Sequence, residues 1–219
     1  MTRHRELEWA PGRTVPLLTE GEGATAVVLA HGAGAGQSHP FMAGMRERLA
    51  SSFAVTTFDY PYIAAGRRAP DRMEILLECH RAVANAAAAD ADRLVLGGKS
   101  MGGRMASHLE APEPAARFFL GYPLVPIGKT EPRDTSHLDR ITTPMLFVQG
   151  ERDRLGPPHL ITGVVARLAA ASMVVINEAD HAFNVPRRAA ISPEQMLDRL
   201  AELVLGWLAA DGGQRSGGS

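Results

Sequence analysis

A serine motif with the spacing Gly-x-Ser-x-Gly stands at Gly98, Ser100 and Gly102, and it is the pattern that most directly suggests chemistry. It follows the apolar run 93–96 and precedes a helical pattern that starts at Met101, the setting in which such a serine acts as a nucleophile. Glycine suits the flanking positions because the turn is too tight for larger side chains. The turn would lift the hydroxyl above the carboxyl edge of a parallel sheet. Because the motif alone also occurs by chance in ordinary turns, its partners decide the interpretation.

A serine hydroxyl becomes a strong nucleophile when an imidazole removes its proton. Three histidines follow the motif in the chain, and His181 is the predicted base. It comes directly after the apolar run 173–176 and before the last helical pattern, so a loop there can carry its ring to the same sheet edge. His137 lies in a polar connection and His159 at the start of a helical pattern, positions typical of solvated surface residues.

The imidazole in turn needs a carboxylate that holds its tautomer. Asp153 lies just beyond the apolar run 145–148, which places it at the expected edge, and it is the predicted acid. Glu151 is the near alternative, although it is closer to the strand and is expected to point away. Asp180 is expected to stabilise the loop, because adjacent side chains normally diverge and this one neighbours His181. The resulting order of serine, acid and histidine is the one that accompanies this motif.

A glycine-rich loop at 31–36 follows the apolar run 27–30 and could help to bind an oxyanion. Attack on an ester carbonyl creates a negative oxygen that needs two preorganised N–H donors. The backbone of Met101 is the first predicted donor, and Ala33 is preferred to Gly34 as the second. His31 is expected to order this loop by hydrogen bonding rather than to act in catalysis.

Nucleotide binding is the rival interpretation of these glycines, and the spacing argues against it. Gln37 and His39 occupy the positions where a Gly-x-Gly-x-x-Gly motif would need its last glycine. The tripeptide Gly-Lys-Ser at 98–100 lacks the upstream glycine of a phosphate-binding loop, because Arg93 stands there.

Several side chains beside the motif have two interpretations. Lys99 and Arg104 flank the serine and could favour an anionic substrate, but pairing with acids such as Asp59 or Glu110 is the preferred reading. Two tyrosines and one cysteine also attract attention. Tyr60 and Tyr62 follow a predicted strand and are candidate substrate-binding residues, although they could equally be aromatics of a surface loop. Cys79 falls on the apolar face of a helical pattern and is interpreted as a small buried hydrophobe.

Short apolar runs alternate with helical patterns along most of the chain, which predicts a mostly parallel sheet with helices on both faces. The runs are continuously apolar, as expected for strands buried on both sides. Only about two dozen residues separate the fourth and fifth runs, too few for a large cap domain. The predicted strands are 27–30, 53–58, 93–96, 118–120, 145–148 and 173–176, and the predicted helices are 41–50, 73–89, 101–109, 160–171 and 193–209.

Composition sets the broad class. The 219 residues contain 45% hydrophobic side chains and carry a formal net charge of −1, which predicts one globular domain over 1–210 and no nucleic-acid partner. Residues 211–219 are rich in glycine and serine and are expected to form a flexible tail. No apolar run is long enough for a membrane span, and the charged start does not resemble a secretory signal. A single cysteine excludes an internal disulfide, so a cytoplasmic location is expected, and no cofactor or metal cluster is indicated.

These motifs together resemble the small lidless α/β-hydrolases that are related to dienelactone hydrolases and include the testis-expressed and chromatin-complex (nonspecific lethal) hydrolase-like proteins. The resemblance covers about 25–208 and is carried by the segments 31–34, 58–62, 66–70, 97–107, 149–153 and 180–186. It implies an α/β-hydrolase fold, with Ser100, Asp153 and His181 as catalytic triad and an ester or related acyl bond as substrate. Dienelactone hydrolases proper carry cysteine in place of this serine, so their substrates do not carry over.

The sequence therefore predicts a serine hydrolase that cleaves small carboxylic esters, since the absence of a cap favours short or accessible acyl groups. Thioester or amide cleavage and acyl transfer use the same groups and remain alternatives. A non-catalytic interaction protein built on the same fold is a further alternative, which the loss of a triad residue or a filled pocket would favour.

Overall fold

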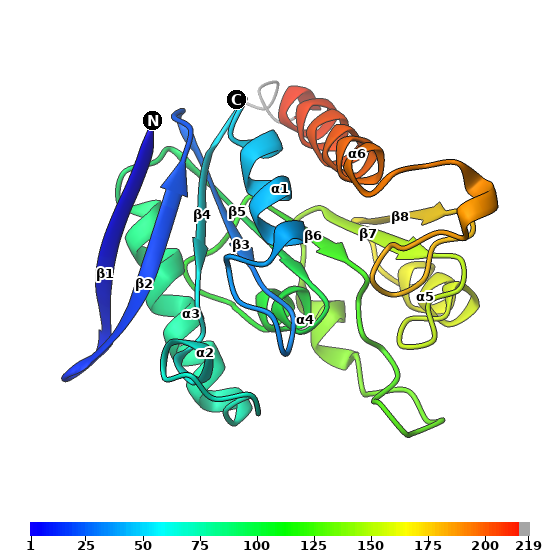
Figure 1. Cartoon of the computed structure of the whole chain (residues 1–219), viewed down its shortest axis with the longest axis horizontal. Coiled ribbons are helices and arrows are strands. Elements are labelled where there is room, and N and C mark those ends of the chain that lie inside the picture. The colour runs from blue at the N-terminus through cyan, green and yellow to red at the C-terminus, as the bar shows by residue number, and fades with distance from the viewer. Residues whose placement is uncertain (215–219) are drawn as a thin grey trace.

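The computed structural model describes residues 1–214, with side chains over 1–210, and its centre is one eight-stranded sheet (Figure 1). The strand order is β1-β2-β4-β3-β5-β6-β7-β8. All neighbours from β4 to β8 run parallel, while β1 pairs antiparallel with β2 and β2 with β4. The strands are β1 (Thr2–Ala10), β2 (Arg13–Glu20), β3 (Thr25–Ala30), β4 (Ala54–Phe58), β5 (Arg93–Lys99), β6 (Ala116–Leu120), β7 (Met145–Gly150) and β8 (Ala171–Ile176).

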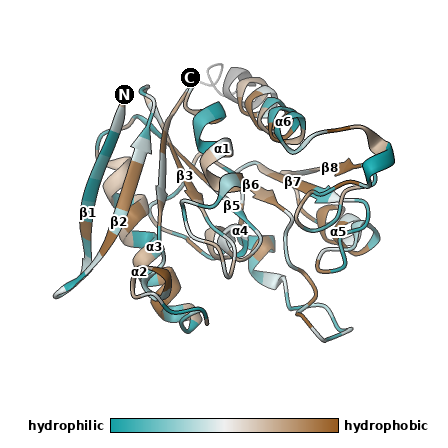
Figure 2. Ribbon diagram, viewed as in Figure 1, coloured by the Kyte–Doolittle hydropathy of each residue, from teal (hydrophilic) through white to brown (hydrophobic). Residues whose placement is uncertain are grey.

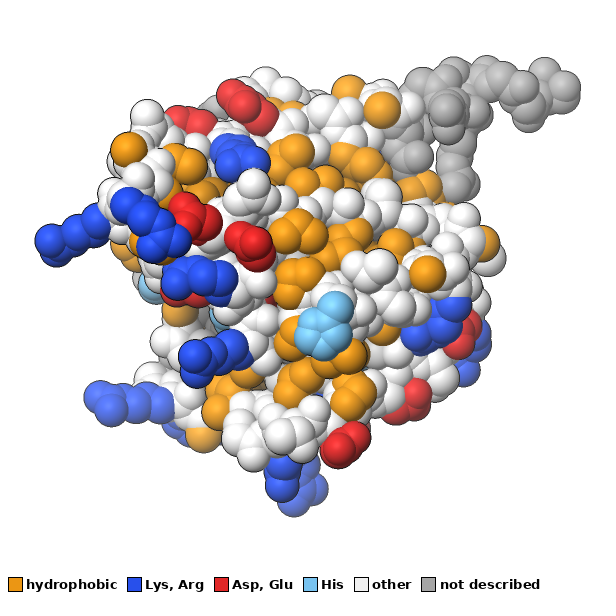
Figure 3. Space-filling model, turned by 90° about the vertical axis from the view of Figure 1, so that its right-hand side faces the viewer, with side chains coloured by type: hydrophobic (Ala, Val, Ile, Leu, Met, Phe, Trp, Pro, Cys, Tyr) orange, Lys and Arg blue, Asp and Glu red, His pale blue; other side chains and the backbone are white. Residues whose placement is uncertain are grey.

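The six predicted strands are all present, and the predicted sheet is confirmed as mostly parallel. The antiparallel pair β1 and β2 is an addition. Its first strand is largely exposed and charged, and only Leu7, Trp9 and Ala10 are shielded from solvent, so no continuous apolar run marks it. At the opposite edge β8 is only partly covered, and Val175 is 37% exposed. Apolar side chains also gather on the face of the molecule on this side (Figure 3).

Helices cover both faces of the sheet, as the alternating pattern predicts. The apolar side of α1 (Pro40–Leu49) and that of α6 (Pro193–Gln214) pack together on one face, around Met45, Leu49 and Leu200. The other face is covered by α3 (Met73–Ala88), α4 (Met101–Ser107) and α5 (Pro158–Val165). The ribbon coloured by hydropathy shows apolar strands between these layers (Figure 2).

The connections differ from expectation in detail. α5 ends at Val165, well before the predicted end at 171. The chain turns at 166–167 and at 169–170 and enters β8 at Ala171. α6 runs to Gln214, into the segment 211–219 that the sequence assigns to a flexible tail; residues 215–219 lie outside the described residues. A short helix, α2 (Pro61–Ala64), follows β4, and two short 3₁₀ turns are η1 (Ser136–Arg140) and η2 (Arg187–Ala189).

The connection between β6 and β7 contains η1 and no other helix or strand, so a large cap domain is absent from the described chain. Within residues 1–214, no helix is both long and apolar enough to cross a membrane. Because β3 to β8 are parallel, the loops that follow them meet at one edge of the sheet. Ser100, Asp153 and His181 all lie in these loops.

Candidate active site

Ser100 occupies the sharp turn between β5 and α4, with a left-handed φ of 50° that non-glycine residues rarely adopt. Two backbone hydrogen bonds hold the turn: the Ser100 N–H donates to Leu120 O at 3.0 Å, and the Arg104 N–H donates to Ser100 O at 3.0 Å. A Cβ at Gly98 would collide with the backbone of Gly102 and Gly103. Gly98 is therefore required by the close approach of α4 to β5, as the motif predicts. Gly102 is required by the close approach of α4 to the end of β3, since its Cβ would collide with the backbone of Ala30 and His31.

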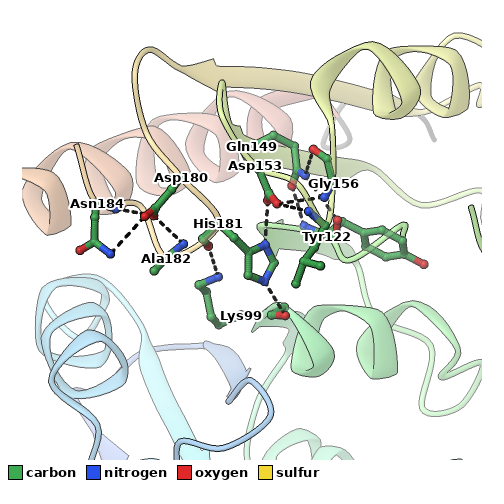
Figure 4. Close-up of polar contacts among 11 residues, drawn as sticks. Lys99, Tyr122, Gln149, Asp153, Gly156, Asp180, His181, Ala182 and Asn184 are labelled. Atoms are coloured by element: carbon green, nitrogen blue, oxygen red, sulfur yellow. Dashed lines mark hydrogen bonds and ion pairs between the residues drawn. The ribbon is translucent and has the colours of Figure 1, made fainter. Parts of the chain in front are cut away.

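His181 lies between the other two residues of the predicted triad (Figure 4). Its Nε2 is 2.8 Å from Ser100 Oγ, and its Nδ1 is 2.8 Å from Asp153 Oδ2. A carboxylate only accepts hydrogen bonds, so Nδ1 carries the proton and the Nε2 lone pair faces the serine hydroxyl. This arrangement can move a proton from the serine to the imidazole.

Asp153 is 2% exposed, and its carboxylate is held by more than the histidine. Its Oδ1 accepts the backbone N–H groups of Leu155 at 2.8 Å and Gly156 at 2.9 Å. Burial acts to raise the pKa of Asp153, but the bond and charge of His181 and these two N–H groups outweigh it and lower the pKa below its usual value. The carboxylate is therefore ionised at neutral pH and stabilises a proton on the imidazole.

The alternative acids and bases have other structural roles. Glu151 is exposed and accepts the backbone N–H of Glu178. Asp180 accepts the N–H groups of Ala182 and Asn184, each at 2.9 Å, which confirms that it stabilises the loop.

The two other candidate histidines lie elsewhere. His159 is exposed, as predicted. The prediction that His137 is a solvated surface residue is wrong: its Nε2 is 3.0 Å from Ser107 Oγ, and its ring stacks on His108 with centroids 3.6 Å apart.

Lys99 holds the loop that carries the histidine. Its Nζ donates to the His181 carbonyl oxygen at 2.6 Å (Figure 4). The same Nζ lies beside the stacked rings of Phe41 and Phe183, 5.9 and 5.2 Å from their centroids. Burial lowers the Lys99 pKa to about 8, although the charges of Asp153 and Asp180 oppose this shift.

The preferred prediction of ion pairs for Lys99 and Arg104 is wrong: Lys99 bonds the His181 carbonyl, and Arg104 Nη2 lies 3.8 Å from Met73 Sδ. Asp59 instead accepts the Gln37 N–H at 2.7 Å, and Glu110 pairs with Arg140 at 3.3 Å. Lys99 and His181 are far apart in the sequence, so the sequence does not predict that the His181 loop folds over Lys99.

The glycine-rich loop 31–36 lies against the serine: a Cβ at Gly32 would be 3.5 Å from Ser100 Cβ. His31 orders this loop, as predicted. Its buried ring accepts the Tyr60 N–H at Nε2, at 3.0 Å, and donates from Nδ1 to Gly32 O at 2.7 Å. Burial lowers the His31 pKa, which favours this neutral form.

The predicted oxyanion donors belong to two segments next to the serine, the glycine-rich loop and the start of α4. Ala33 and Gly34 are exposed, and Gly34 has a left-handed φ of 82°. Met101 is the first residue of α4, where backbone N–H groups have no partner within a helix. The assignment of these N–H groups as oxyanion donors stays a prediction.

Tyr60 and Tyr62 require a correction. Both side chains are entirely buried, so neither lines an open substrate pocket and neither is a surface-loop aromatic. The Tyr60 hydroxyl is 3.0 Å from His80 Nδ1, and its ring packs edge-on to His31 at 4.9 Å. The chain turns into α2 directly after β4, and this turn directs both rings under the glycine-rich loop. Cys79 is buried, as predicted.

Gln149 is a positioning residue that the sequence analysis misses. Its side chain accepts the backbone N–H of Tyr122 and donates to Gly156 O at 2.9 Å. It therefore fastens the Asp153 loop to the end of β6 (Figure 4). A fully buried amide near the end of the apolar run Met145–Gly150 is the signal that could have identified it.

The fold is similar to that of solved structures. Three solved structures illustrate this: Est1E from Butyrivibrio proteoclasticus (15% identity, TM-score 0.76, 96% of this chain and 99% of that one), an alpha-beta serine hydrolase homologue from Coxiella burnetii (16%, 0.75, 95% and 98%), and XC6422 from Xanthomonas campestris, a serine hydrolase without lid (18%, 0.73, 94% and 93%). At these identities the likeness shows the shared fold. No curated protein has a matching sequence.

Residues 23–209 match the family model described as Alpha/beta hydrolase domain, which covers the sheet from β3 onward, the serine turn and both loops of the candidate site. With the strand order, the Gly-x-Ser-x-Gly turn and the order of the three hydrogen-bonded residues already established, the chain belongs to the alpha/beta hydrolase domain family.

Proposed function

We propose that this protein is a serine hydrolase that cleaves small carboxylic esters through an acyl-enzyme on Ser100. The observation that carries the proposal is the continuous hydrogen-bond chain from Asp153 through His181 to Ser100, with both distances 2.8 Å. Structural neighbours that are esterases, such as a thermophilic esterase from Thermogutta terrifontis, agree with it. We also propose that the protein shares its ancestry with dienelactone-hydrolase-like and testis-expressed hydrolase-like proteins, because its sequence motifs resemble theirs.

In the proposed reaction, His181 Nε2 takes the hydroxyl proton while Ser100 Oγ attacks the ester carbonyl carbon. The carbonyl oxygen becomes an oxyanion, which accepts hydrogen bonds from the N–H groups of Met101 and Ala33, with Gly34 as the alternative to Ala33. The C–O bond to the alcohol then breaks, and the imidazolium gives its proton to the leaving oxygen. Water repeats these steps on the acyl-enzyme and releases the acid.

Two structural features support a small acyl substrate. The connection between β6 and β7 supplies no cap that could enclose a long lipid chain. Ala33 and Gly34 are exposed, so a short ester can approach the serine directly from solvent. Thioesters and amides react through the same steps. Comparing kcat/KM for an ester, a thioester and an amide with the same acyl group shows which bond the enzyme prefers.

The test uses short-chain p-nitrophenyl esters and a fluorophosphonate probe on the wild type, on Ser100→Ala, and on Ser51→Ala as a control at an exposed serine. We expect turnover and labelling in the wild type and the control, and neither in Ser100→Ala. Circular dichroism checks that each variant is folded. Equal inertness of folded wild type and Ser100→Ala towards every ester and the probe would refute the proposal and favour a non-catalytic interaction protein.

A further inference from the structure

The glycine-rich loop 31–36 leaves the sheet beside the end of β4. The strands β3 and β4 run parallel and side by side (Figure 1), and their last residues, Ala30 and Phe58, are paired in register. The residues that follow the two strands therefore meet at the edge of the sheet where Ser100 lies. A Cβ at Gly32 would be 3.5 Å from Ser100 Cβ, so the loop passes directly beside the serine.

Both ends of this loop are attached to the two residues that follow β4. At the first end, the His31 ring accepts the Tyr60 N–H at Nε2, at 3.0 Å. At the second end, the Gln37 N–H donates to Asp59 Oδ1 at 2.7 Å. The loop that faces the serine is thus held between two hydrogen bonds to one short segment of the chain.

The Asp59 carboxylate is the contact that acts directly on the loop backbone. A Cβ at Gly36 would be 2.5 Å from Asp59 Oδ1, so the carboxylate also packs against the main chain one residue before Gln37. A hydrogen bond from a backbone N–H to an ionised carboxylate is roughly twice as strong as a neutral one. Glycines at 32, 34 and 36 give the loop little rigidity of its own, so its position depends on what holds its ends.

Gln37 is itself fixed by a buried polar network. Its Nε2 donates to Pro16 O on β2 at 3.0 Å, and its Oε1 accepts the Thr57 hydroxyl on β4 at 3.1 Å. Arg46 of α1 donates to the same hydroxyl at 3.2 Å and forms an ion pair with Glu20 of β2 at 2.9 Å. The network gives the loop a fixed end point, and the carboxylate after β4 sets the direction in which the chain leaves it.

We propose that Asp59 is a positioning residue that holds the glycine-rich loop where the N–H of Ala33, or of Gly34 as its alternative, can bind the oxyanion. The proposal rests on the proposed serine hydrolase function and on the predicted donors of this loop. The oxyanion forms only as Ser100 attacks the ester. A displaced donor therefore weakens binding of the transition state and leaves binding of the ester nearly unchanged.

The test compares phenyl acetate with its thiono analogue O-phenyl ethanethioate, in which sulfur replaces the carbonyl oxygen. Sulfur is a weaker hydrogen-bond acceptor than oxygen, so well-placed oxyanion donors favour the oxygen ester. The measured quantities are kcat, KM and the ratio of kcat/KM for the oxygen ester over the thionoester. This ratio reports the oxyanion donors, whereas a misplaced base slows both substrates alike.

The proteins are the wild type and four variants. Asp59→Ala removes the carboxylate, and Asp59→Asn keeps an oxygen that can accept the Gln37 N–H. Asp134→Ala is the matched control, because Asp134 also accepts a backbone N–H, that of Ser136 at 2.9 Å, but lies in the β6–β7 connection. Lys99→Met is the comparison variant that disturbs the loop of the base instead.

We expect the wild type and Asp134→Ala to favour the oxygen ester by about a hundredfold or more. In Asp59→Ala, kcat for phenyl acetate should fall about tenfold or more with KM nearly unchanged, and the ratio should fall by a similar factor. Asp59→Asn replaces a charged bond by a neutral one and should lose only about threefold in each. Lys99→Met should slow both substrates equally and keep the wild-type ratio.

Two results would overturn the proposal. One is a folded Asp59→Ala, checked by circular dichroism, that keeps the wild-type kcat. The other is a loss of kcat at an unchanged ratio, which a general loosening of the fold produces. Where Asp59→Ala does not fold, the threefold change expected in Asp59→Asn decides in the same way.

The two proposals fail differently. Ester turnover that needs Ser100 but is indifferent to Asp59 sinks the positioning role and keeps the hydrolase. Hydrogen–deuterium exchange tests the loop without catalysis: the protected amides within 31–39 should exchange about tenfold faster in Asp59→Ala than in the wild type and Asp134→Ala. That result supports the positioning role even where no ester is cleaved, and equal exchange in the three proteins contradicts it.

Discussion

Replacing Lys99 by methionine tests how firmly the His181 loop must be held. The ammonium donates to the His181 carbonyl at 2.6 Å, and methionine removes that donor while keeping an unbranched side chain beside Phe41 and Phe183. Sulfur packs favourably against aromatic rings, so the local packing should survive. The substitution therefore removes one charged hydrogen bond and little else.

The size of the effect follows from that bond. A hydrogen bond from a charged group contributes about 1.5–3 kcal/mol. Each 1.4 kcal/mol lost from the productive arrangement of His181 slows the reaction about tenfold. We therefore expect kcat on a neutral p-nitrophenyl ester to fall about ten- to a hundredfold, with KM nearly unchanged, because Lys99 contacts the loop rather than the ester.

The pH profile distinguishes this positioning role from a general loss of structure. The Lys99 pKa of about 8 means that the ammonium is present below pH 8 and is lost as the pH rises through that value. Wild-type kcat should therefore decline above about pH 8, and Lys99→Met should lack this decline. An unchanged kcat in the folded variant, or an alkaline decline that persists in it, would refute the reasoning.

Two further substitutions test the geometry around Ser100. In Asp153→Asn the amide can donate to His181 Nδ1 and so favours the wrong tautomer; we expect kcat to fall by about 10⁴-fold in steady-state assays, and a fall below tenfold would contradict the assigned acid. In Gly102→Ala the new Cβ would collide with the backbone of Ala30, so urea unfolding should show a loss of about 1–3 kcal/mol. Gly163→Ala in α5, where a Cβ meets nothing within 4 Å, is the matched control and should stabilise by about 0.5–1 kcal/mol; equal midpoints for both variants would contradict the packing argument.

Local signals in the sequence were sufficient for the parallel strands and the serine turn. Continuous apolar runs mark strands that are buried on both faces, and a tight turn needs its glycines, so neither depends on distant contacts. The meeting of Asp153 and His181 was also predictable, because parallel strands bring their following loops to one edge. The strand β1 was not predictable from the sequence. It is a mostly exposed and charged edge strand, so it contains no continuous apolar run.

The sequence did not predict which groups the side chains in the loops contact. The surroundings of Lys99 and His137 depend on how separate loops fold over each other, which local spacing does not encode. For Tyr60 and Tyr62 the strand ending was predicted, but the direction of the rings depends on the turn into α2. Contacts between loops therefore need the three-dimensional structure.

Two residues whose features oppose stability are neighbours at the candidate site. Ser100 has a left-handed backbone φ, and burial lowers the pKa of the neighbouring Lys99, which has no carboxylate as hydrogen-bond partner among the described residues. Each of these features opposes stability, and none is needed to build an eight-stranded sheet. Strain and unpaired charge that collect at one sheet edge are expected where a protein is selected to act on a ligand. These destabilising features support a reacting site at Ser100 independently of the Gly-x-Ser-x-Gly motif. They are properties of the folded structure, whereas the motif is a spacing of glycine and serine in the sequence.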